Sequence, residues 1–377
     1  MDRVVSLVKN VPHGHFLCNN CYMNIGIYSP YLDTLTGGEK YILTAASSLS
    51  KEHRVTIFWD DSSILEKAAK KFNLEFNNVV VSSNIFSADT GFIKRYIQTL
   101  KYDRILFLSD GSIPLVGAKK LLIHFQFPVE WVNTNSFLFL FKKSRVSKII
   151  CNSYFTKQFI DKKFGVNSFL LYPPATTATE VKKKKENIIL TVGRFSLLKN
   201  GTDFKKLGIM VKNFKKFQKK RLKGWTMAIV TSVRPDLENA FKTFEESIKS
   251  SHIKIYKNAS FQLTEEMYSK AKIYWHAAGF GEDLIRHPER AEHFGISTVE
   301  AMSHGCIPVV INAGGQKEIV NDGDNGFLWN TEDELVEKTH AIAVNKDDLK
   351  RIAERAVESS ERFSNERFCE ELNHLIW

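Results

Sequence analysis

Short runs of β-branched and aromatic residues alternate along the chain with longer segments in which apolar residues recur at helical spacing. This alternation is typical of a doubly wound parallel sheet, in which each buried strand leads into a helix that is apolar on one face. In the first half, strands are predicted over residues 24–28, 54–59, 78–82, 104–108, 121–125, 148–152 and 168–172. In the second half, they are predicted over residues 187–192, 226–231, 253–256, 273–276, 307–311 and 326–329. The pattern therefore predicts two α/β units in series.

Helices are predicted between and after these strands, for example over residues 39–50, 237–250, 264–271, 297–304, 347–360 and 365–376. Two prolines, Pro173 and Pro174, precede a lysine run that ends at Lys185, and we place the linker there because prolines interrupt both helix and strand. We expect a poorly ordered extension over 1–23, a first domain over 24–178, a second over 179–360, and a C-terminal helix over 361–377 that packs back on the first domain.

The chain has 377 residues, which exceeds what one hydrophobic core usually serves and agrees with two domains. Five scattered cysteines give no disulfide framework, and the pair Cys18 and Cys21 has no second pair to complete a metal site. No apolar run approaches the roughly 20 residues of a membrane span, so we expect a cytosolic protein. The net charge of +11 favours polyanionic ligands such as a phosphorylated ligand, anionic lipid or nucleic acid.

The most informative segment places Glu292 before a turn at Gly295 and Glu300 in the first turn of the helix that follows. Free N–H groups at the start of a helix favour a phosphate, and carboxylates beside it can hold sugar or ribose hydroxyls. Ser297 and Glu300 also have the spacing of a capping box, which by itself would account for Glu300. Glu292 precedes the helix and has no such explanation, so the pair together favours a ligand site.

Glu292 and Glu300 form an E-x7-E motif that resembles the signature of retaining family-4 glycosyltransferases. The stretches 275–281, 292–305 and 321–326 are similar to that family too. The resemblance covers about residues 24–377 and implies the GT-B fold, an α/β architecture of two Rossmann-like domains that face each other across a cleft. It also implies that Glu292 binds hydroxyls of the donor sugar, that Glu300 binds the nucleotide ribose, and that the amides of Phe294, Gly295 and Ile296 face the sugar and distal phosphate.

Cations are expected beside these carboxylates. The segment 191–201, which contains Gly193, Arg194 and Lys199, follows a predicted strand and resembles the GR…K segment of the family. A diphosphate leaving group gathers negative charge as the glycosidic bond breaks, and Arg194 and Lys199 would stabilise that charge. The lysines from Lys205 to Lys223 and from Lys182 to Lys185 are interpreted instead as a solvated surface.

Two features of the first domain resemble the other wall of such a cleft. Gly37 and Gly38 stand where a strand turns into a helix, so that a ligand can approach the backbone closely. The pair lacks the spacing of a G-x-G-x-x-G fingerprint, which argues against a dehydrogenase. His124, at the end of an apolar strand, would by default be a core histidine, but its H-x-x-x-P context resembles that of a histidine that reaches the donor in similar enzymes.

The resemblance implies a retaining transfer without a carboxylate nucleophile. The acceptor hydroxyl attacks from the face that the diphosphate leaves, and a phosphate oxygen takes its proton. No metal or other cofactor is expected, and Asp322-Gly-Asp324 is interpreted as a turn rather than a metal motif. The donor is expected to be a GDP- or UDP-hexose and the acceptor a glycan or lipid-linked glycan in surface polysaccharide or glycolipid assembly.

The segment 137–145 combines apolar bulk with adjacent cations, a composition suited to the surface of an anionic membrane. A buried helix with a solvated end explains the same residues, and we favour that explanation at this stage. Among other functions, a sugar-nucleotide epimerase, a phosphorylase or a non-catalytic nucleotide-sugar-binding protein could share the architecture. A nucleic-acid-binding protein is suggested by charge alone, and the sequence contains no known module of that kind, so no nucleic-acid partner is expected.

Overall fold

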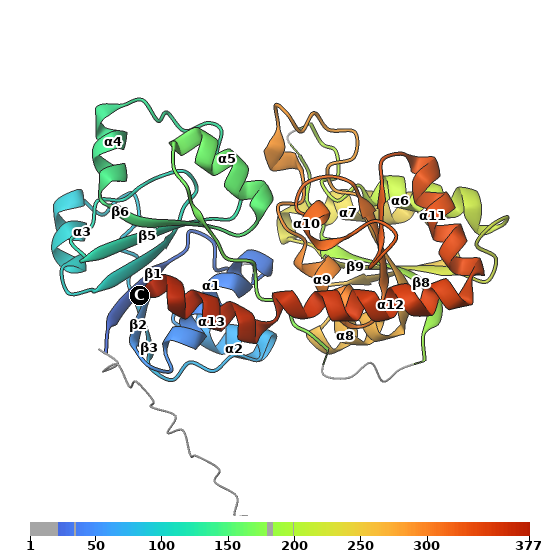
Figure 1. Ribbon diagram of the computed structural model, residues 1–377, viewed down its shortest axis with the longest axis horizontal. Coiled ribbons are helices and arrows are strands. Elements are labelled where there is room, and N and C mark those ends of the chain that lie inside the picture. Colours follow the sequence, from blue (N-terminus) through green and yellow to red (C-terminus); the bar gives the residue numbers. More distant parts are fainter. Residues whose placement is uncertain (1–21, 34, 179–183, 199) are drawn as a thin grey trace, which may run out of the picture.

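The computed structural model describes residues 22–33, 35–178, 184–198 and 200–377, and it consists of two α/β domains side by side (Figure 1). The pair Cys18 and Cys21 lies outside the described residues. Each domain is built on one parallel sheet, with strand orders β3-β2-β1-β4-β5-β6-β7 and β10-β9-β8-β11-β12-β13. The predicted doubly wound fold is confirmed.

The first domain follows the predicted alternation closely. Its strands are β1 (Asn24–Tyr28), β2 (Arg54–Phe58), β3 (Val79–Ser82), β4 (Arg104–Leu108), β5 (Lys120–Phe125), β6 (Val146–Cys151) and β7 (Phe169–Leu170). Its helices are α1 (Gly37–Leu49), α2 (Ile64–Phe72), α3 (Phe92–Thr99), α4 (Phe137–Ser144) and α5 (Tyr154–Phe164). α1 and α2 pack on one face of the sheet, whereas α4 and α5 pack on the other through Phe139, Ile160 and Phe164.

The second domain repeats the arrangement. Its strands are β8 (Glu186–Arg194), β9 (Thr226–Ser232), β10 (Ile253–Lys257), β11 (Ala271–His276), β12 (Ile307–Ile311) and β13 (Phe327–Trp329). Its helices are α6 (Leu207–Gln218), α7 (Glu238–Ser247), α8 (Phe261–Lys270), α9 (Ile296–Ser303), α10 (Gln316–Ile319), α11 (Glu332–Val344) and α12 (Lys346–Ser360). Residues from α6, α7 and α11 form the core on one face of the sheet, and residues from α8, α9 and α10 form the core on the other.

The chain crosses between the domains twice, and the two crossings lie next to each other. The second crossing runs through a short 3-10 turn (Glu361–Phe363), whose Phe363 carbonyl accepts a hydrogen bond of 2.9 Å from the amide of Ala175 in the first crossing. The aromatic rings of Tyr172, Phe294 and Phe363 pack together there at centroid distances of 5.1–5.4 Å. The interdomain junction is therefore a packed cluster.

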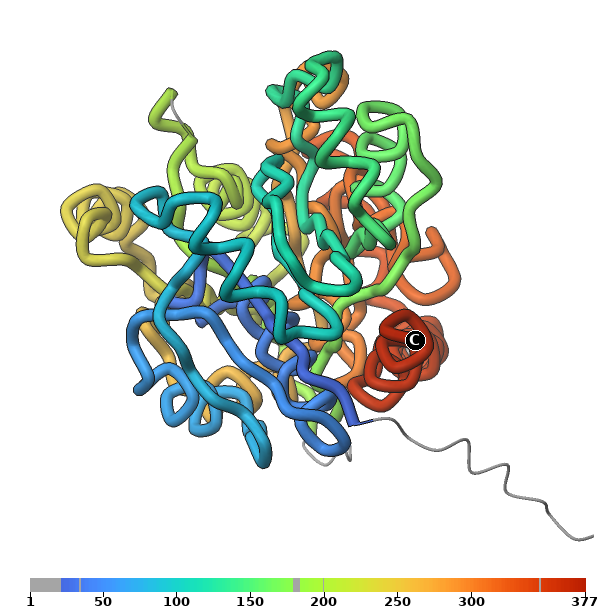
Figure 2. Tube along the Cα trace, turned by 90° about the vertical axis from the view of Figure 1, so that its left-hand side faces the viewer, coloured from blue at the N-terminus to red at the C-terminus, as the bar shows by residue number. Residues whose placement is uncertain are grey.

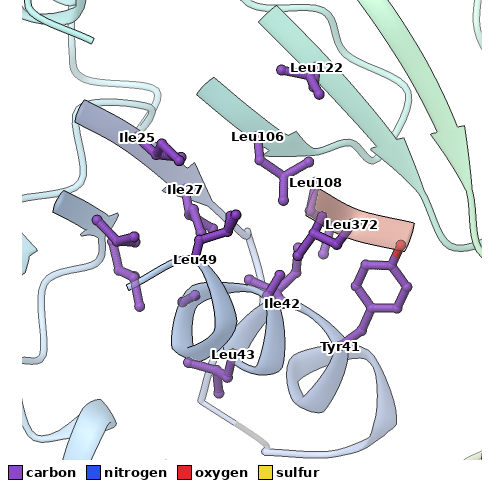
Figure 3. Packing of buried hydrophobic residues seen from close by; sticks show 14 of the residues in the cluster. Ile25, Ile27, Tyr41, Ile42, Leu43, Leu49, Leu106, Leu108, Leu122 and Leu372 are labelled. Atoms are coloured by element: carbon purple, nitrogen blue, oxygen red, sulfur yellow. The ribbon is translucent and has the colours of Figure 1, made fainter. Parts of the chain in front are cut away.

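The last helix, α13 (Asn365–Ile376), returns to the first domain. Its buried residues Phe368, Leu372 and Ile376 belong to the same core as Ile25 and Ile27 of β1. Figure 3 shows Leu372 beside Tyr41 and Ile42 of α1, and Figure 2 shows the chain end against the first domain. The C-terminal residues thus complete the core of the first domain.

Replacement of Leu372 by Ala tests this role. Leu372 is fully buried, so we expect the variant to lose about 2–5 kcal/mol of unfolding free energy through lost burial and the cavity left behind. Chemical denaturation followed by circular dichroism measures the change. The matched control is His374→Ala on the exposed side of the same helix, which should stay within about 0.5 kcal/mol of the parent. Equal stabilities of the two variants would contradict the assignment.

Candidate active site

A cleft of about 770 Å³ lies between the two domains, a volume typical of sites for small molecules. It is bordered by residues at the carboxyl ends of β4, β5, β8 and β9, where ligands bind in open α/β sheets. Eight residues singled out by the sequence line it: Gly37, Gly38, Arg194, Glu292, Phe294, Gly295, Ile296 and Glu300. The structure therefore brings both predicted walls together around one cavity.

Glu292 is held by two partners. Its carboxylate pairs with the ammonium group of Lys205, and its Oε2 lies 2.9 Å from Nε2 of His276 at the end of β11. Burial alone would raise the pKa of Glu292, but the charge of Lys205 and the hydrogen bond from His276 outweigh it and hold the pKa well below the usual range. Burial also lowers the pKa of His276, so this ring is neutral and donates its Nε2 proton to the carboxylate.

Lys205 was missed by the sequence analysis, which assigned it to a solvated surface. The loop before α6 places it in the cleft, because the Asp203 carboxylate accepts hydrogen bonds from the amides of Lys205 (2.9 Å) and Leu207 (2.5 Å). The next residue, Lys206, pairs at 2.5 Å with Glu282, whose side chain is 7% exposed. The solvated-surface prediction is thus wrong for both lysines, and the only signal in the sequence was an aspartate two residues before Lys205.

The same prediction is wrong for Lys185. Its ammonium group donates to the carbonyls of Tyr268 (3.0 Å) and Ala271 (2.8 Å), and burial lowers its pKa. Lys182 and Lys183 lie outside the described part of the chain.

The turn before α9 depends on glycine. Gly295 has a φ of 121°, which disfavours other residues, and a Cβ there would lie 2.3 Å from Nε2 of the Gln316 side chain. Gly314 and Gly315 lie next to this turn, and the Gly315 amide donates a hydrogen bond of 2.8 Å to the Glu292 carbonyl. The Gly295 carbonyl accepts from the amides of Thr298 and Val299, whereas the amides of Ile296 and Ser297 precede the first hydrogen bond of the helix and lie at the cleft, where they favour an anion.

Glu300 contacts the other domain rather than the start of its own helix. Its Oε1 pairs with Nζ of Lys40 on α1 at 2.8 Å, and its Oε2 accepts from the Tyr268 hydroxyl at 3.3 Å. Ser297 does not serve as the N-cap, since Gly295 holds that position and the Ser297 hydroxyl lies 2.8 Å from that of Tyr274. The capping-box explanation of Glu300 is therefore wrong.

The glycine pair of the first domain makes close contacts in the cleft. A Cβ on Gly37 would lie 2.9 Å from Cδ1 of Ile296 in the other domain, and one on Gly38 would lie 2.5 Å from Oε1 of Gln126. The Gln126 amide also donates to the Gly38 carbonyl at 3.1 Å. A side chain at position 37 would press on Ile296 across the cleft, and one at position 38 would press on Gln126 of its own domain.

His124 does not reach the cleft, and the role predicted for it needs correction. Its ring is fully buried, stacks on Tyr41 of α1 at 4.2 Å, and places Nδ1 3.2 Å from the Ile150 carbonyl. β5 ends at Phe125, so the side chain at position 124 remains in the layer between sheet and helix. Gln126, two residues further on, lines the cleft instead.

Of the two cations predicted from the GR…K segment, one lies in the described part of the chain and the other does not. Arg194 is the last residue of β8, is exposed, and lines the cleft. Lys199 lies outside the described residues. Lys205 provides a cation beside Glu292.

Residues 175–359 match the family model described as "Glycosyl transferases group 1". GDP-Man:Man(3)GlcNAc(2)-PP-Dol alpha-1,2-mannosyltransferase of Dictyostelium discoideum is 22% identical over 437 residues, which cover 94% of this chain and 84% of that protein. The enzyme of the same name from Neurospora crassa is 26% identical over 265 residues, which cover 59% of this chain and 44% of that protein. Together these matches indicate a glycosyltransferase.

Solved structures show that the glycosyltransferase has the GT-B fold. The Anabaena protein HepE in complex with UDP and glucose superposes with a TM-score of 0.68 at 19% identity, covering 94% of this chain and 99% of that one. A glycosyltransferase from Rickettsia africae gives a TM-score of 0.68 at 17% identity, covering 94% and 98% of the two chains.

Two further features of this glycosyltransferase concern metals and membranes. In the described ranges, no three His, Cys, Asp or Glu side chains gather in a way that could hold a metal ion. Asp322 lies in a turn, where it binds the Leu328 amide and Lys338, and Asp324 pairs with Arg355. No helix in the described part of the chain has the length and apolarity needed to cross a bilayer.

The buried histidine makes the stability of the enzyme depend on pH. Burial lowers the pKa of His124 to about 3 from 6.5, so below pH 6.5 the unfolded chain takes up a proton that the folded chain does not. We therefore expect the unfolding free energy to fall as the pH falls, with His124 contributing about 2 kcal/mol of loss between pH 7 and 5.

Denaturant titrations of the parent and of His124→Asn at both pH values measure this contribution. The variant should be less stable at pH 7 because it loses packing, but its further loss on going to pH 5 should be smaller than that of the parent. An equal loss in both proteins would show that His124 is not kept neutral by the fold.

Proposed function

We propose that the protein is a retaining hexosyltransferase that moves a hexose from a GDP- or UDP-linked donor to a glycan or lipid-linked acceptor. The observation that carries this proposal is the ionised Glu292, paired with Lys205 and His276 next to the N-terminus of α9. A fixed carboxylate beside an anion-favouring helix end suits a ligand that has sugar hydroxyls at one end and phosphates next to them.

The cleft offers one partner for each part of such a donor. The amides at the start of α9, together with Arg194 and Lys205, would hold the diphosphate. Glu292 would accept hydrogen bonds from hexose hydroxyls, and Glu300 would accept them from the ribose. Lys40 pairs with Glu300 across the cleft, so the donor would have to share or replace that contact.

In the proposed reaction the acceptor hydroxyl attacks the anomeric carbon from the face on which the diphosphate leaves. The bond between this carbon and the phosphate oxygen breaks, and the diphosphate takes the electron pair and the proton of the hydroxyl. Arg194 and Lys205 stabilise the negative charge on the leaving group, as fixed cations do most effectively in a partly dehydrated site. Configuration is retained because attack and departure share one face.

The relatives suggest which donors and acceptors to test first. The Dictyostelium and Neurospora relatives are named for GDP-mannose and a dolichol-linked acceptor, and HepE was solved with UDP and glucose. GDP-mannose and UDP-glucose are therefore the first donors to compare. A true donor raises the melting temperature through binding to the folded state, and a panel of nucleotide sugars identifies it.

Glu292→Gln tests the central role in this proposal. With the donor identified from that panel, we expect a loss of about 100- to 1000-fold in kcat, because the neutral amide no longer accepts hydroxyl hydrogen bonds as a charged group. Binding of the bare nucleoside diphosphate should change less than about threefold. The matched control is Glu289→Gln, a carboxylate three residues away that does not line the cleft. Full activity in Glu292→Gln would refute the proposal.

The proposed mechanism requires no metal ion, since side-chain cations and helix amides stabilise the leaving group. Transfer measured in the presence of excess EDTA should therefore stay within about twofold of the untreated enzyme. Loss of activity that returns with added Mg²⁺ or Mn²⁺ would show that a metal takes part in the reaction.

A further inference from the structure

Helix α3 presents its apolar residues outward. Ile93, Tyr96, Ile97 and Leu100 have the i, i+3, i+4, i+7 spacing of one helix face and are 42–61% exposed. The inward side of the helix is polar, because Thr99 is buried and Arg95 donates to the carbonyls of residues 85 and 90 at 3.0 Å. A surface helix usually has the reverse arrangement, so this orientation requires an explanation.

Helix α4 has the same property. Phe137 is 86% exposed, Leu138, Leu140 and Phe141 are 48–56% exposed, and only Phe139 packs inward, against Phe164 at 5.3 Å. The buried-helix interpretation of this segment is therefore wrong. Nine of the nineteen large exposed apolar side chains in the described part of the chain belong to α3, to Leu100 directly after it, or to α4.

The two helices lie at the same end of the molecule. In Figure 1 both are at the left edge of the first domain, away from the second domain. Neither helix contains an acidic residue, whereas Lys94, Lys101 and Arg145 are exposed in or beside them. The surface formed by α3, Leu100 and α4, which we call the α3–α4 surface, is therefore apolar with cationic flanks.

We propose that the α3–α4 surface docks on an anionic bilayer, with its apolar side chains in the interface and its cations among the headgroups. Amphipathic surfaces with aromatic and aliphatic residues beside Lys and Arg bind membranes in this way. A symmetric contact between two copies fits less well, because it would bring cations face to face without acidic partners on the two helices. The charge of the surface thus favours lipid over a second copy.

The position of this surface connects it to the cleft. Phe127 lines the cleft and stacks with the exposed ring of Trp131 at a centroid distance of 6.1 Å, and the chain continues from there to Phe137. The segment from Phe127 to Phe137 would thus offer an aromatic path from the docked surface to the edge of the cleft. The link to the cleft rests on the proposed lipid-linked acceptor, whereas membrane docking itself does not.

Flotation of the full-length protein with phosphatidylcholine vesicles, with and without 30% phosphatidylglycerol, tests the proposal. We expect binding to the anionic vesicles and a loss of at least about tenfold in Ile93→Ser/Ile97→Ser/Phe137→Ser/Phe141→Ser. The double variant Lys94→Gln/Arg145→Gln should bind anionic vesicles about 5-fold more weakly for each cation removed, and its binding to neutral vesicles should not change. Ile285→Ser/Val344→Ser removes two exposed apolar residues of the second domain and should bind like the parent.

The outcomes distinguish the proposal from its alternatives and from the proposed function. Unchanged melting temperature and nucleotide binding would show that the four-site variant is folded. Equal flotation of parent and four-site variant, or a parent that forms dimers through this surface and does not float, would overturn docking. Because flotation needs no donor or acceptor, a failure of transfer activity leaves its result interpretable.

Discussion

A carboxylate that is four-fifths buried stays ionised only where a cation and hydrogen-bond donors surround it, and the site is organised around this requirement at Glu292. Two elements meet it, and a third fixes the backbone that carries the side chain. The end of β11 supplies His276, the loop before α6 supplies Lys205, and Gly315 holds the backbone of Glu292 in place. Glu292 and Lys205 themselves line the cleft, so the second domain sets the position of this carboxylate in the site.

The first domain completes the cleft through contacts that cross the domain boundary. Lys40 reaches Glu300, and Gly37 allows Ile296 to approach because it has no side chain. The adjacent chain crossings and the return of α13 keep the two domains in register. A donor that competes with Lys40 for Glu300 would therefore act on a contact between domains, which couples ligand binding to their relative position.

The sequence predicted the architecture well and the site in part, for physical reasons. Buried parallel strands are near-continuous apolar runs, so the first and last residues of β1, β4 and β12 were predicted correctly. The two glutamates of the E-x7-E motif are close in the sequence, so a single turn and the helix that follows it place both of them at the site. Lys205 and His276 could not be assigned because their partner is distant in the chain, and His124 was misassigned because a strand end does not reveal which layer receives a side chain. Exposure of α4 was also unpredictable, since an apolar segment with cations suits both core and membrane.

A crystal structure with bound GDP or UDP tests the central claim most directly. The account predicts the diphosphate at the start of α9, within hydrogen-bond distance of Arg194 or Lys205, and the ribose beside Glu300, with Glu292 facing the space beyond the last phosphate. A nucleotide bound elsewhere, or one whose distal phosphate points away from Glu292, would contradict it.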